Sequence, residues 1–220
     1  LKINNLSLEG IYSHLANSDS NNASLNQTQI NSFLKIIEKT KKQKNNNIKF
    51  HILNSGGLFN YGNYKYDLVR TGLSIYGISP LGIHNHNLKP VMEFKAPVIL
   101  KKNIKSGVMV GYGNSYKSKK NMDLAIVQCG YGDGVPFEYS NKGFVFYNKN
   151  KIPIIGRISM DLICIDITNI DIQINDYVTL WGSIDDNDSR LEYIATMFNN
   201  IPYTFITGIT SRVKKEYVYE

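Results

Sequence analysis

Residues of the types that bind ligands or move protons stand where short apolar stretches of this chain end. His14 follows GIYS, His51 and the pair Asn54-Ser55 follow KF, and Arg70 follows YDLV. In α/β folds with parallel strands, sites form at the carboxyl ends of the strands, because loops there vary without disturbing the core. The NSGG stretch offers a hydroxyl and unhindered N–H groups, which favours anion binding. Taken singly, each feature also suits an ordinary structural histidine or a Ser-Gly-Gly turn.

A second group of candidate residues lies in two glycine-rich stretches and in a strand-like stretch that mixes apolar and polar residues. Tyr112 in VGYGNSY and Tyr131 in CGYGDGVP each stand between glycines, which permit tight turns and close approach. Each tyrosine is therefore either held in an exposed position where it has a function, or is an ordinary surface residue of a glycine-rich hairpin. The stretch IIGRISMDLICID has the alternation of a buried strand, yet it carries Arg157, Met160 and Asp161, which filling a core does not require.

The first part of the chain alternates strand and helix patterns. Strands are predicted over residues 8–13 and 49–53, with an amphipathic helix over 23–41 between them. The stretch 66–74 follows, and this order is typical of β-α-β units. A closed eight-stranded α/β barrel takes about 250 residues. The first 85 residues are therefore expected to form part of such a barrel or a small open α/β unit.

From residue 91 onward, short strands dominate. They are predicted over 91–100, 124–129, 143–147, 152–167 and 177–181. One late helix is expected over 189–199. The change of pattern predicts two domains, an α/β piece over 1–85 and an antiparallel β domain over 86–220.

Composition narrows the class of protein. A chain of 220 residues with 42% hydrophobic and 20% charged residues buries a real core. Its cysteines, Cys129 and Cys164, lie in apolar runs, so we expect packing roles and a reducing, cytoplasmic setting. No stretch approaches the roughly eighteen apolar residues of a membrane span, and the start resembles no signal peptide. Because the chain begins with Leu1, we expect further sequence upstream.

The net charge of +7 raises nucleic acid as a partner. The lysines are scattered over loops such as 39–42 and 117–120, and no predicted helix gathers them into a stripe. We therefore interpret the charge as solvated surface and expect neither a nucleic-acid nor a membrane partner.

Six motifs, in this order, resemble the second half of a bacterial alanine racemase. They are LEGIYSHLANSD, HILNSGG, VRTGLSIYGISP, VGYGNSY, GYGDGVP and GRISMD, and they cover nearly all of the chain. GRISMD after GYGDG distinguishes the pattern from that of the related decarboxylases. The resemblance implies the last βα units of a TIM-like (β/α)8 barrel of fold-type III, followed by an antiparallel β domain.

The resemblance also implies an activity. The family interconverts L- and D-alanine through an aldimine with pyridoxal 5'-phosphate, supplies D-alanine for peptidoglycan and uses no metal. A lysine and a tyrosine act as bases on opposite faces of the substrate. Tyr112 matches that tyrosine, which belongs to one subunit of a homodimer and acts in the site of the other. Met160 matches the residue whose backbone meets the substrate carboxylate, which accounts for its presence in GRISMD.

Further positions match the family's cofactor site. Arg70 matches the arginine that faces the pyridine nitrogen, and His14 matches the histidine that links this region to the tyrosine. Ser55, with the backbone of Gly72 and Leu73, matches the phosphate ligands. An arginine does not transfer its proton to the pyridine nitrogen. The unprotonated pyridine ring then withdraws less negative charge from the α-carbon than a pyridinium would, which limits side reactions such as transamination.

Three further residues match the entrance to the family's site, and several positions differ from the family's pattern. Asp19, Tyr131 and Arg157 match residues around the entrance to the site. Phe137 stands where the family usually has an arginine, and Ser211 where some members have a tyrosine. The family's second base, the lysine of a KANAYGHG-type motif, has no counterpart in these 220 residues, nor have the phosphate-binding tyrosine and substrate-binding arginine of that half.

Two interpretations follow from these matches and departures. The leading one is an alanine racemase of which this chain lacks the N-terminal half of the barrel and is inactive by itself. The alternative is a non-catalytic fragment or pseudo-enzyme that keeps the dimerisation and substrate-gating surface.

Overall fold

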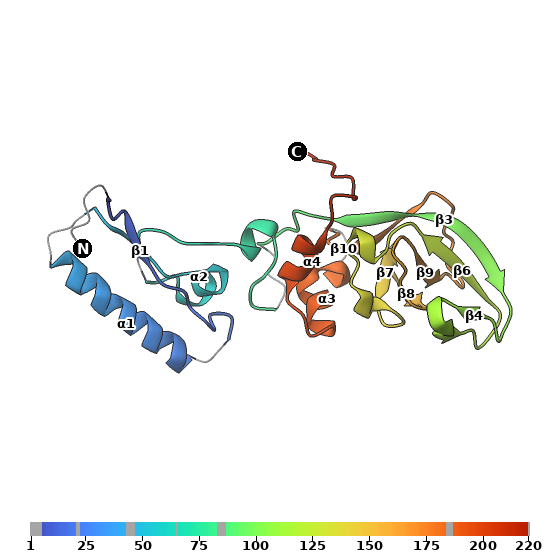
Figure 1. The fold of residues 1–220 in the computed structure, drawn as a ribbon, viewed down its shortest axis with the longest axis horizontal. Helices are drawn as coiled ribbons and strands as arrows, with labels where there is room; N and C mark the ends of the chain where they lie inside the picture. The colour runs from blue at the N-terminus through green and yellow to red at the C-terminus, as the bar shows by residue number, and fades with distance from the viewer. Residues whose placement is uncertain are drawn as a thin grey trace. The chain divides into compact units, whose positions relative to one another are not determined.

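The computed structural model of the chain describes residues 6–20, 23–42, 47–64, 66–82, 87–183 and 187–219. The chain divides into two compact units, Leu1–Leu88 and Lys89–Glu220 (Figure 1). The domain boundary predicted between residues 85 and 86 lies outside the described residues.

The first unit combines a two-stranded parallel sheet with helices. Its elements are β1 (Gly10–Tyr12), α1 (Ala23–Lys41), β2 (Lys49–His51), α2 (Ser55–Tyr61) and the 3₁₀ helix η1 (Leu73–Tyr76). The two strands pair in parallel, with Ile11 opposite Phe50. Because α1 connects them, both strands end at the same edge of the sheet, which is where the candidate residues follow.

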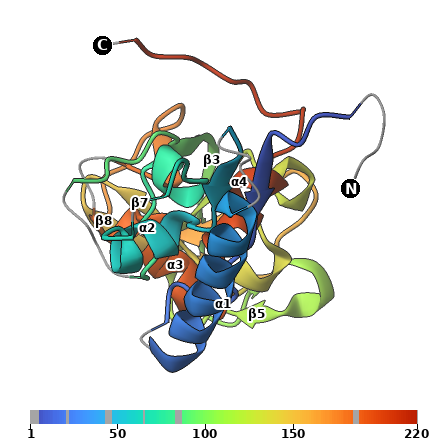
Figure 2. The same ribbon diagram turned by 90° about the vertical axis from the view of Figure 1, so that its left-hand side faces the viewer.

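Helix α1 packs on this sheet through one apolar face and lies alongside β1 in both views (Figures 1 and 2). Ile30, Phe33 and Ile37 are buried in one cluster with Phe50 and Ile52. Full burial of each such side chain contributes about 1.5–3 kcal/mol. The helix predicted over 23–41 is confirmed with the same bounds.

The stretch 66–74 runs beside β2 without forming a strand. The Asp67 N–H donates to the Phe50 carbonyl at 3.0 Å, and the Arg70 N–H donates to the Leu53 carbonyl at 2.9 Å. The Asp67 carboxylate also accepts from the Phe50 N–H at 2.7 Å. These bonds fix where the Arg70 side chain leaves the backbone, but they do not make a ladder.

The second unit is built around a closed six-stranded antiparallel barrel in the order β10-β3-β6-β9-β8-β7. Its strands are β3 (Phe94–Ile104), β6 (Met122–Val127), β7 (Phe144–Tyr147), β8 (Asn150–Ile155), β9 (Ile163–Asp166) and β10 (Tyr177–Trp181). A separate pair is formed by β4 (Met109–Val110) and β5 (Tyr116–Lys117). Closure leaves the barrel without an unpaired edge.

Short helices complete the second unit. They are η2 (Tyr112–Asn114), η3 (Tyr131–Asp133), η4 (Phe137–Tyr139), η5 (Asn187–Ser189), α3 (Leu191–Met197) and α4 (Pro202–Gly208). The helix predicted over 189–199 is confirmed as α3, whereas α4 was not predicted. It supplies Phe205, which packs edge-on against Trp181 with ring centroids 5.5 Å apart. Phe94 packs on the same indole at 4.8 Å, so this core joins α4 to the barrel.

The single strand predicted over 152–167 is wrong. β8 ends at Ile155 and β9 begins at Ile163, with a turn between them. Gly156 has a φ of +79°, a conformation that favours glycine. The Ser159 N–H donates to the Leu162 carbonyl, and the Leu162 N–H donates to the Ser159 hydroxyl, both at 3.0 Å. The polar run GRISMD therefore occupies a turn at the barrel rim.

In the part of the chain that the structure describes, no helix has the length and apolar character needed to cross a membrane.

The two units are expected to differ in independent stability. A closed barrel has no exposed edges, whereas a two-stranded parallel sheet is marginal alone. Residues 89–220 expressed separately should therefore unfold cooperatively on heating, followed by circular dichroism. Residues 1–88 alone should show a broad transition or associate; a sharp, monomeric transition of this piece would contradict the expectation.

Candidate functional site

The guanidinium group of Arg70 is held at the carboxyl ends of both parallel strands. Its Nη1 lies 2.7 Å from Nδ1 of His51 and donates to the His51 carbonyl at 3.2 Å. Its Nη2 donates to the Ser13 carbonyl at 2.7 Å and lies 3.3 Å from Nδ1 of His14. Ser13 and His14 follow β1, and His51 ends β2. One rigid planar side chain therefore ties the two strand ends together.

The contact with Arg70 sets the protonation state of His51. Because a guanidinium group only donates, Nδ1 of His51 is the acceptor and the ring is neutral. Burial, followed by the charge of Arg70, lowers the pKa of His51 below its ordinary value of 6.5. The ring of Tyr12 stacks on His51 at 5.5 Å, and Cζ of Arg70 lies 5.1 Å from the centre of the Tyr12 ring. The cationic group is thus packed as well as hydrogen-bonded.

Asn54 links His14 to the start of α2. Its amide nitrogen lies 3.1 Å from Nε2 of His14. Its amide oxygen accepts from the Gly57 N–H at 2.9 Å, which caps the helix, and from the Ser18 hydroxyl at 2.6 Å. The position of His14 is therefore coupled to the first turn of α2.

The hydroxyl of Ser55, the first residue of α2, is buried and accepts from the Gly72 N–H at 2.9 Å. Leu73 begins η1 directly after Gly72, so the starts of two short helices lie together. The loop after β1 comes close as well, because a Cβ on Gly56 would lie 3.0 Å from the backbone nitrogen of Asp19. Asp19 is thereby placed beside α2, with its side chain exposed.

The structure joins Tyr112 and Arg157 across one turn of the second unit. Gly111 and Gly113, on either side of Tyr112, have φ angles of +78° and +67°. A Cβ on Gly111 would lie 2.6 Å from the Arg157 nitrogen, and one on Gly113 would lie 3.2 Å from its Nη1. Arg157 therefore packs against this turn, and the Tyr112 side chain remains 72% exposed.

Tyr131 and Met160 are also brought together. The Tyr131 N–H donates to the Ser159 carbonyl at 3.0 Å, and the Gly132 N–H donates to the Met160 carbonyl at 2.9 Å. A Cβ on Gly130 would clash with both carbonyls, so the close approach of these two segments requires glycine there. The candidate residues of the second unit thus lie in two contacting pairs, Tyr112 with Arg157 and Tyr131 with Met160.

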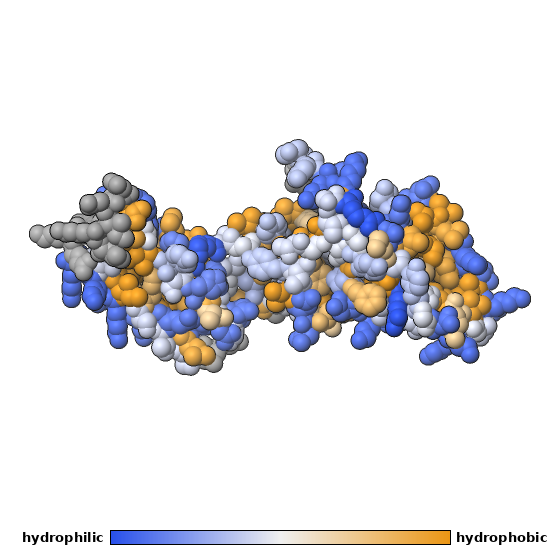
Figure 3. Space-filling model, in the orientation of Figure 1, coloured by the Kyte–Doolittle hydropathy of each residue, from blue (hydrophilic) through white to orange (hydrophobic). Residues whose placement is uncertain are grey.

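Large apolar side chains reach the surface near Tyr131 and Met160. They include Phe137, whose ring packs edge-on against Tyr131 at 6.3 Å, and Leu162. Apolar side chains are also visible on the face of the molecule in Figure 3. Clustered exposed apolar residues are typical of interaction surfaces.

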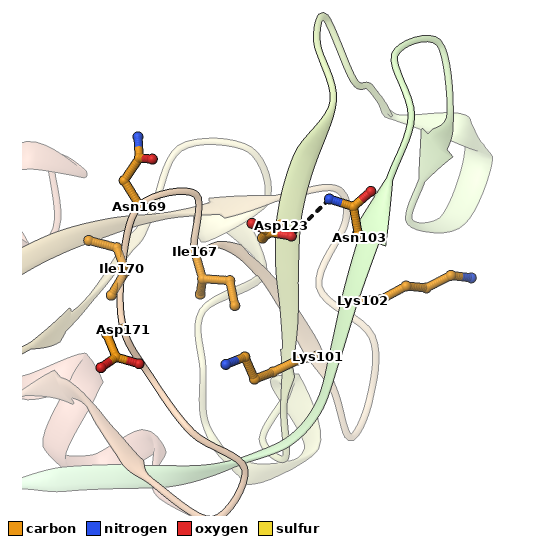
Figure 4. A pocket seen from close by; sticks show the side chains of 8 residues that line it. All are labelled: Lys101, Lys102, Asn103, Asp123, Ile167, Asn169, Ile170 and Asp171. Atoms are coloured by element: carbon orange, nitrogen blue, oxygen red, sulfur yellow. Dashed lines mark hydrogen bonds between the residues drawn. The ribbon is translucent and has the colours of Figure 1, made fainter.

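A separate hollow of about 560 Å³ lies on the second unit (Figure 4). Lys101, Asn103 and Asp123 on its strands face Asp171 on the loop after β9. The Asn103 amide donates to the Asp123 carboxylate at 2.9 Å, so part of its polar lining is already paired. It contains none of the candidate residues, and the sequence motifs did not indicate it.

Comparisons with known proteins agree with both units. The C-terminal domain model of alanine racemase matches residues 91–217, and the N-terminal domain model matches residues 1–80. An alanine racemase of Vesicomyosocius okutanii is 40% identical over 92% of this chain, which covers 55% of that protein. The chain thus spans about half the length of the curated relatives it matches.

Solved structures give the same result. The alanine racemase of Bartonella henselae with covalently bound pyridoxal phosphate is 36% identical, with a TM-score of 0.84 over 96% of this chain and 56% of that one. The alanine racemase of Streptomyces coelicolor is 28% identical, with a TM-score of 0.87 over the same shares. The predicted fold class is confirmed, a partial α/β barrel followed by a β domain.

The state of His51 is open to a direct test. Its imidazole should titrate with a midpoint below 6.5 in an NMR pH titration, because burial and the Arg70 charge both disfavour protonation. Arg70→Gln should raise the midpoint. Lys49→Gln removes an exposed charge from the same strand and should leave it nearly unchanged. Equal midpoints in the wild type and Arg70→Gln would contradict the assignment.

Proposed function

The chain belongs to the alanine racemase family, and from that membership we propose that the protein containing it interconverts L- and D-alanine with pyridoxal 5'-phosphate, in the cytoplasm, for peptidoglycan synthesis. The Arg70 network is the observation that carries the proposal. It holds the permanently charged guanidinium group of Arg70 at the strand ends, where this group donates to the Ser13 carbonyl and to the neutral ring of His51.

The side chains of the first unit fit the proposed cofactor. The Ser55 hydroxyl accepts from the Gly72 N–H, so its own proton is available for a phosphate oxygen. The Leu73 N–H at the start of η1 adds a further donor, and the Gly72 N–H would contribute by turning from Ser55 to the phosphate. When bound, pyridoxal phosphate draws electron density from the α-carbon and makes its hydrogen acidic. Arg70 keeps its proton and so limits this withdrawal when it faces the pyridine nitrogen. His14, held by Arg70 and Asn54, would connect this region to the catalytic tyrosine.

The second unit would supply the groups that meet the amino acid. The Tyr112 Oη would move the proton at the α-carbon from one face. Met160 would bind the substrate carboxylate through its N–H, since a carboxylate needs a donor and the Met160 carbonyl already accepts from Gly132. Asp19, Tyr131 and Arg157 would line the entrance.

A homodimer with shared sites is part of the proposal. Tyr112 is 72% exposed on a turn that Arg157 and two left-handed glycines hold in place. A constrained, protruding tyrosine suits a group that acts in the site of a second copy. Exposed apolar residues of the same unit, among them Phe137 beside Tyr131 and Leu162 after Met160, supply surface for such a contact.

The 220-residue chain by itself is not expected to racemise alanine. It lacks the lysine that would hold the cofactor and act as one base. Circular dichroism of L-alanine incubated with the chain and pyridoxal phosphate should show no conversion beyond that with free pyridoxal phosphate. Conversion clearly above that background would refute the expectation.

Racemisation is expected when the N-terminal half of a racemase of this family is fused before the chain. In this fusion, Tyr112→Phe should lower turnover about a hundred- to ten-thousand-fold, because general acid–base groups contribute that much. The ring is retained, so cofactor absorbance should persist.

The fusion also makes a directional test possible. In Tyr112→Phe the lysine still serves its own face, so the α-hydrogen of D-alanine should exchange with solvent deuterium far faster than that of L-alanine. Tyr203→Phe, at a half-exposed tyrosine of α4, is the matched control and should racemise normally. Equal exchange of both enantiomers at the normal rate would make Tyr112 an ordinary surface tyrosine.

A further inference from the structure

The tail that follows α4 carries an arginine that joins three segments far apart in the sequence. Arg212 forms an ion pair with the carboxylate of Asp161, and its Nε lies 3.6 Å from Oδ1 of Asp133. Asp161 follows Met160, and Asp133 ends the turn that begins with Tyr131. One guanidinium group therefore bridges the two loops that carry these entrance and substrate residues.

The backbone of the tail holds the arginine in this position. The Thr210 hydroxyl donates to the Gly132 carbonyl at 2.8 Å, and the Thr210 N–H donates to the Asp133 carbonyl at 3.4 Å. A Cβ on Gly132 would clash with Nη1 of Arg212, so the guanidinium group lies directly on this glycine. The same Cβ would lie 3.0 Å from Cγ of Met160, so the Met160 side chain approaches this place too.

Asp133 uses its two carboxylate oxygens differently. Oδ2 accepts from the Gly130 N–H at 2.9 Å and closes the turn, while Oδ1 faces Arg212. Only 15% of the Asp133 side chain is exposed, so this carboxylate is partly shielded from solvent. A partly shielded carboxylate interacts more strongly with its ionic partner than a solvated carboxylate does.

A second ion pair in the same tail has a different character. Lys214 and Glu216 pair with each other, with 83% and 72% of their side chains exposed. They tie two tail residues together and reach no loop of the barrel through this contact. Exposed pairs of this kind contribute little to stability, which makes Lys214 a suitable control for the loss of one positive charge.

We propose that Arg212 is a positioning residue that holds the turn of Tyr131 and the loop of Met160 in a single arrangement. The consequence for catalysis rests on the proposed racemase function. Arg212 acts through the two loops and not on the reacting atoms, so its loss should weaken substrate binding more than chemistry. We expect Arg212→Gln to raise the KM for alanine about three- to tenfold and to change kcat less than about twofold.

The arrangement of the loops is measured without activity. The 220-residue chain contains five methionines, so a sample labelled with ¹³C at the methionine methyl groups gives few NMR resonances, and Met160→Leu identifies that of Met160. Arg212→Gln should shift the Met160 resonance, Lys214→Gln should not, and Arg212→Lys should restore it in part, because the charge is kept and the fork is lost.

Asp161→Asn provides an independent variant in case Arg212→Gln does not fold. It removes one partner of the arginine and should shift the Met160 resonance in the same direction. An unmoved resonance in the folded variants would overturn the proposal, as would an unchanged KM in an active fusion with Arg212→Gln. A wild-type fusion without racemase activity would refute the proposed function alone, since the NMR result decides the positioning role separately.

Discussion

Closure of the hydrogen-bond ladder by β10 is the constraint on which the second unit depends. β10 pairs with β3 on one side, where Val178 lies opposite Ala96, and with β7 on the other, where Thr179 lies opposite Phe146. A barrel closed in this way has no free edge, and each loop leaves it at a fixed point on its rim. The connections that carry Tyr112, Tyr131 and Met160 leave the barrel at such fixed points, and glycines accommodate the places where they touch.

The first unit reaches its arrangement by another route. Its two paired strands are short, and an arginine supplies the tie that further strand pairing would give elsewhere. Arg70 requires acceptors, and it finds them in the carbonyls of Ser13 and His51 and in a neutral imidazole. The chemistry of the donor, which never releases its proton, thus dictates both the strand-end geometry and the protonation state of His51.

Some of this was predictable from the sequence because local signals were strong. The apolar spacing of Ile30, Phe33 and Ile37 predicted the helix and its buried face, and the alternation in 177–181 predicted β10. The motifs located every candidate residue, but their roles came from the resemblance and remain proposals.

Other features depend on contacts that no local pattern encodes. The break between β8 and β9 depends on a left-handed Gly156 and on the Ser159 and Leu162 hydrogen bonds, while apolar alternation continues on both sides of it. The helix α4 is short, and Phe205 gains its role only by reaching Trp181. Arg212 sits one residue after Ser211, which the motif comparison had singled out, but its partners lie about 50 and 80 positions away, beyond the reach of any spacing rule.

The buried indole of Trp181 has a use as a spectroscopic reporter. It is the only tryptophan in the chain, it is fully buried, and its ring touches both Phe94 of β3 and Phe205 of α4. Intrinsic emission excited at the red edge of the absorption band therefore comes from the second unit alone. A red shift would register the undocking of α4 from the barrel, and the tail that bears Arg212 begins where α4 ends. Tryptophan emission thus reports whether that tail is anchored to the barrel, independently of structural changes in the first unit.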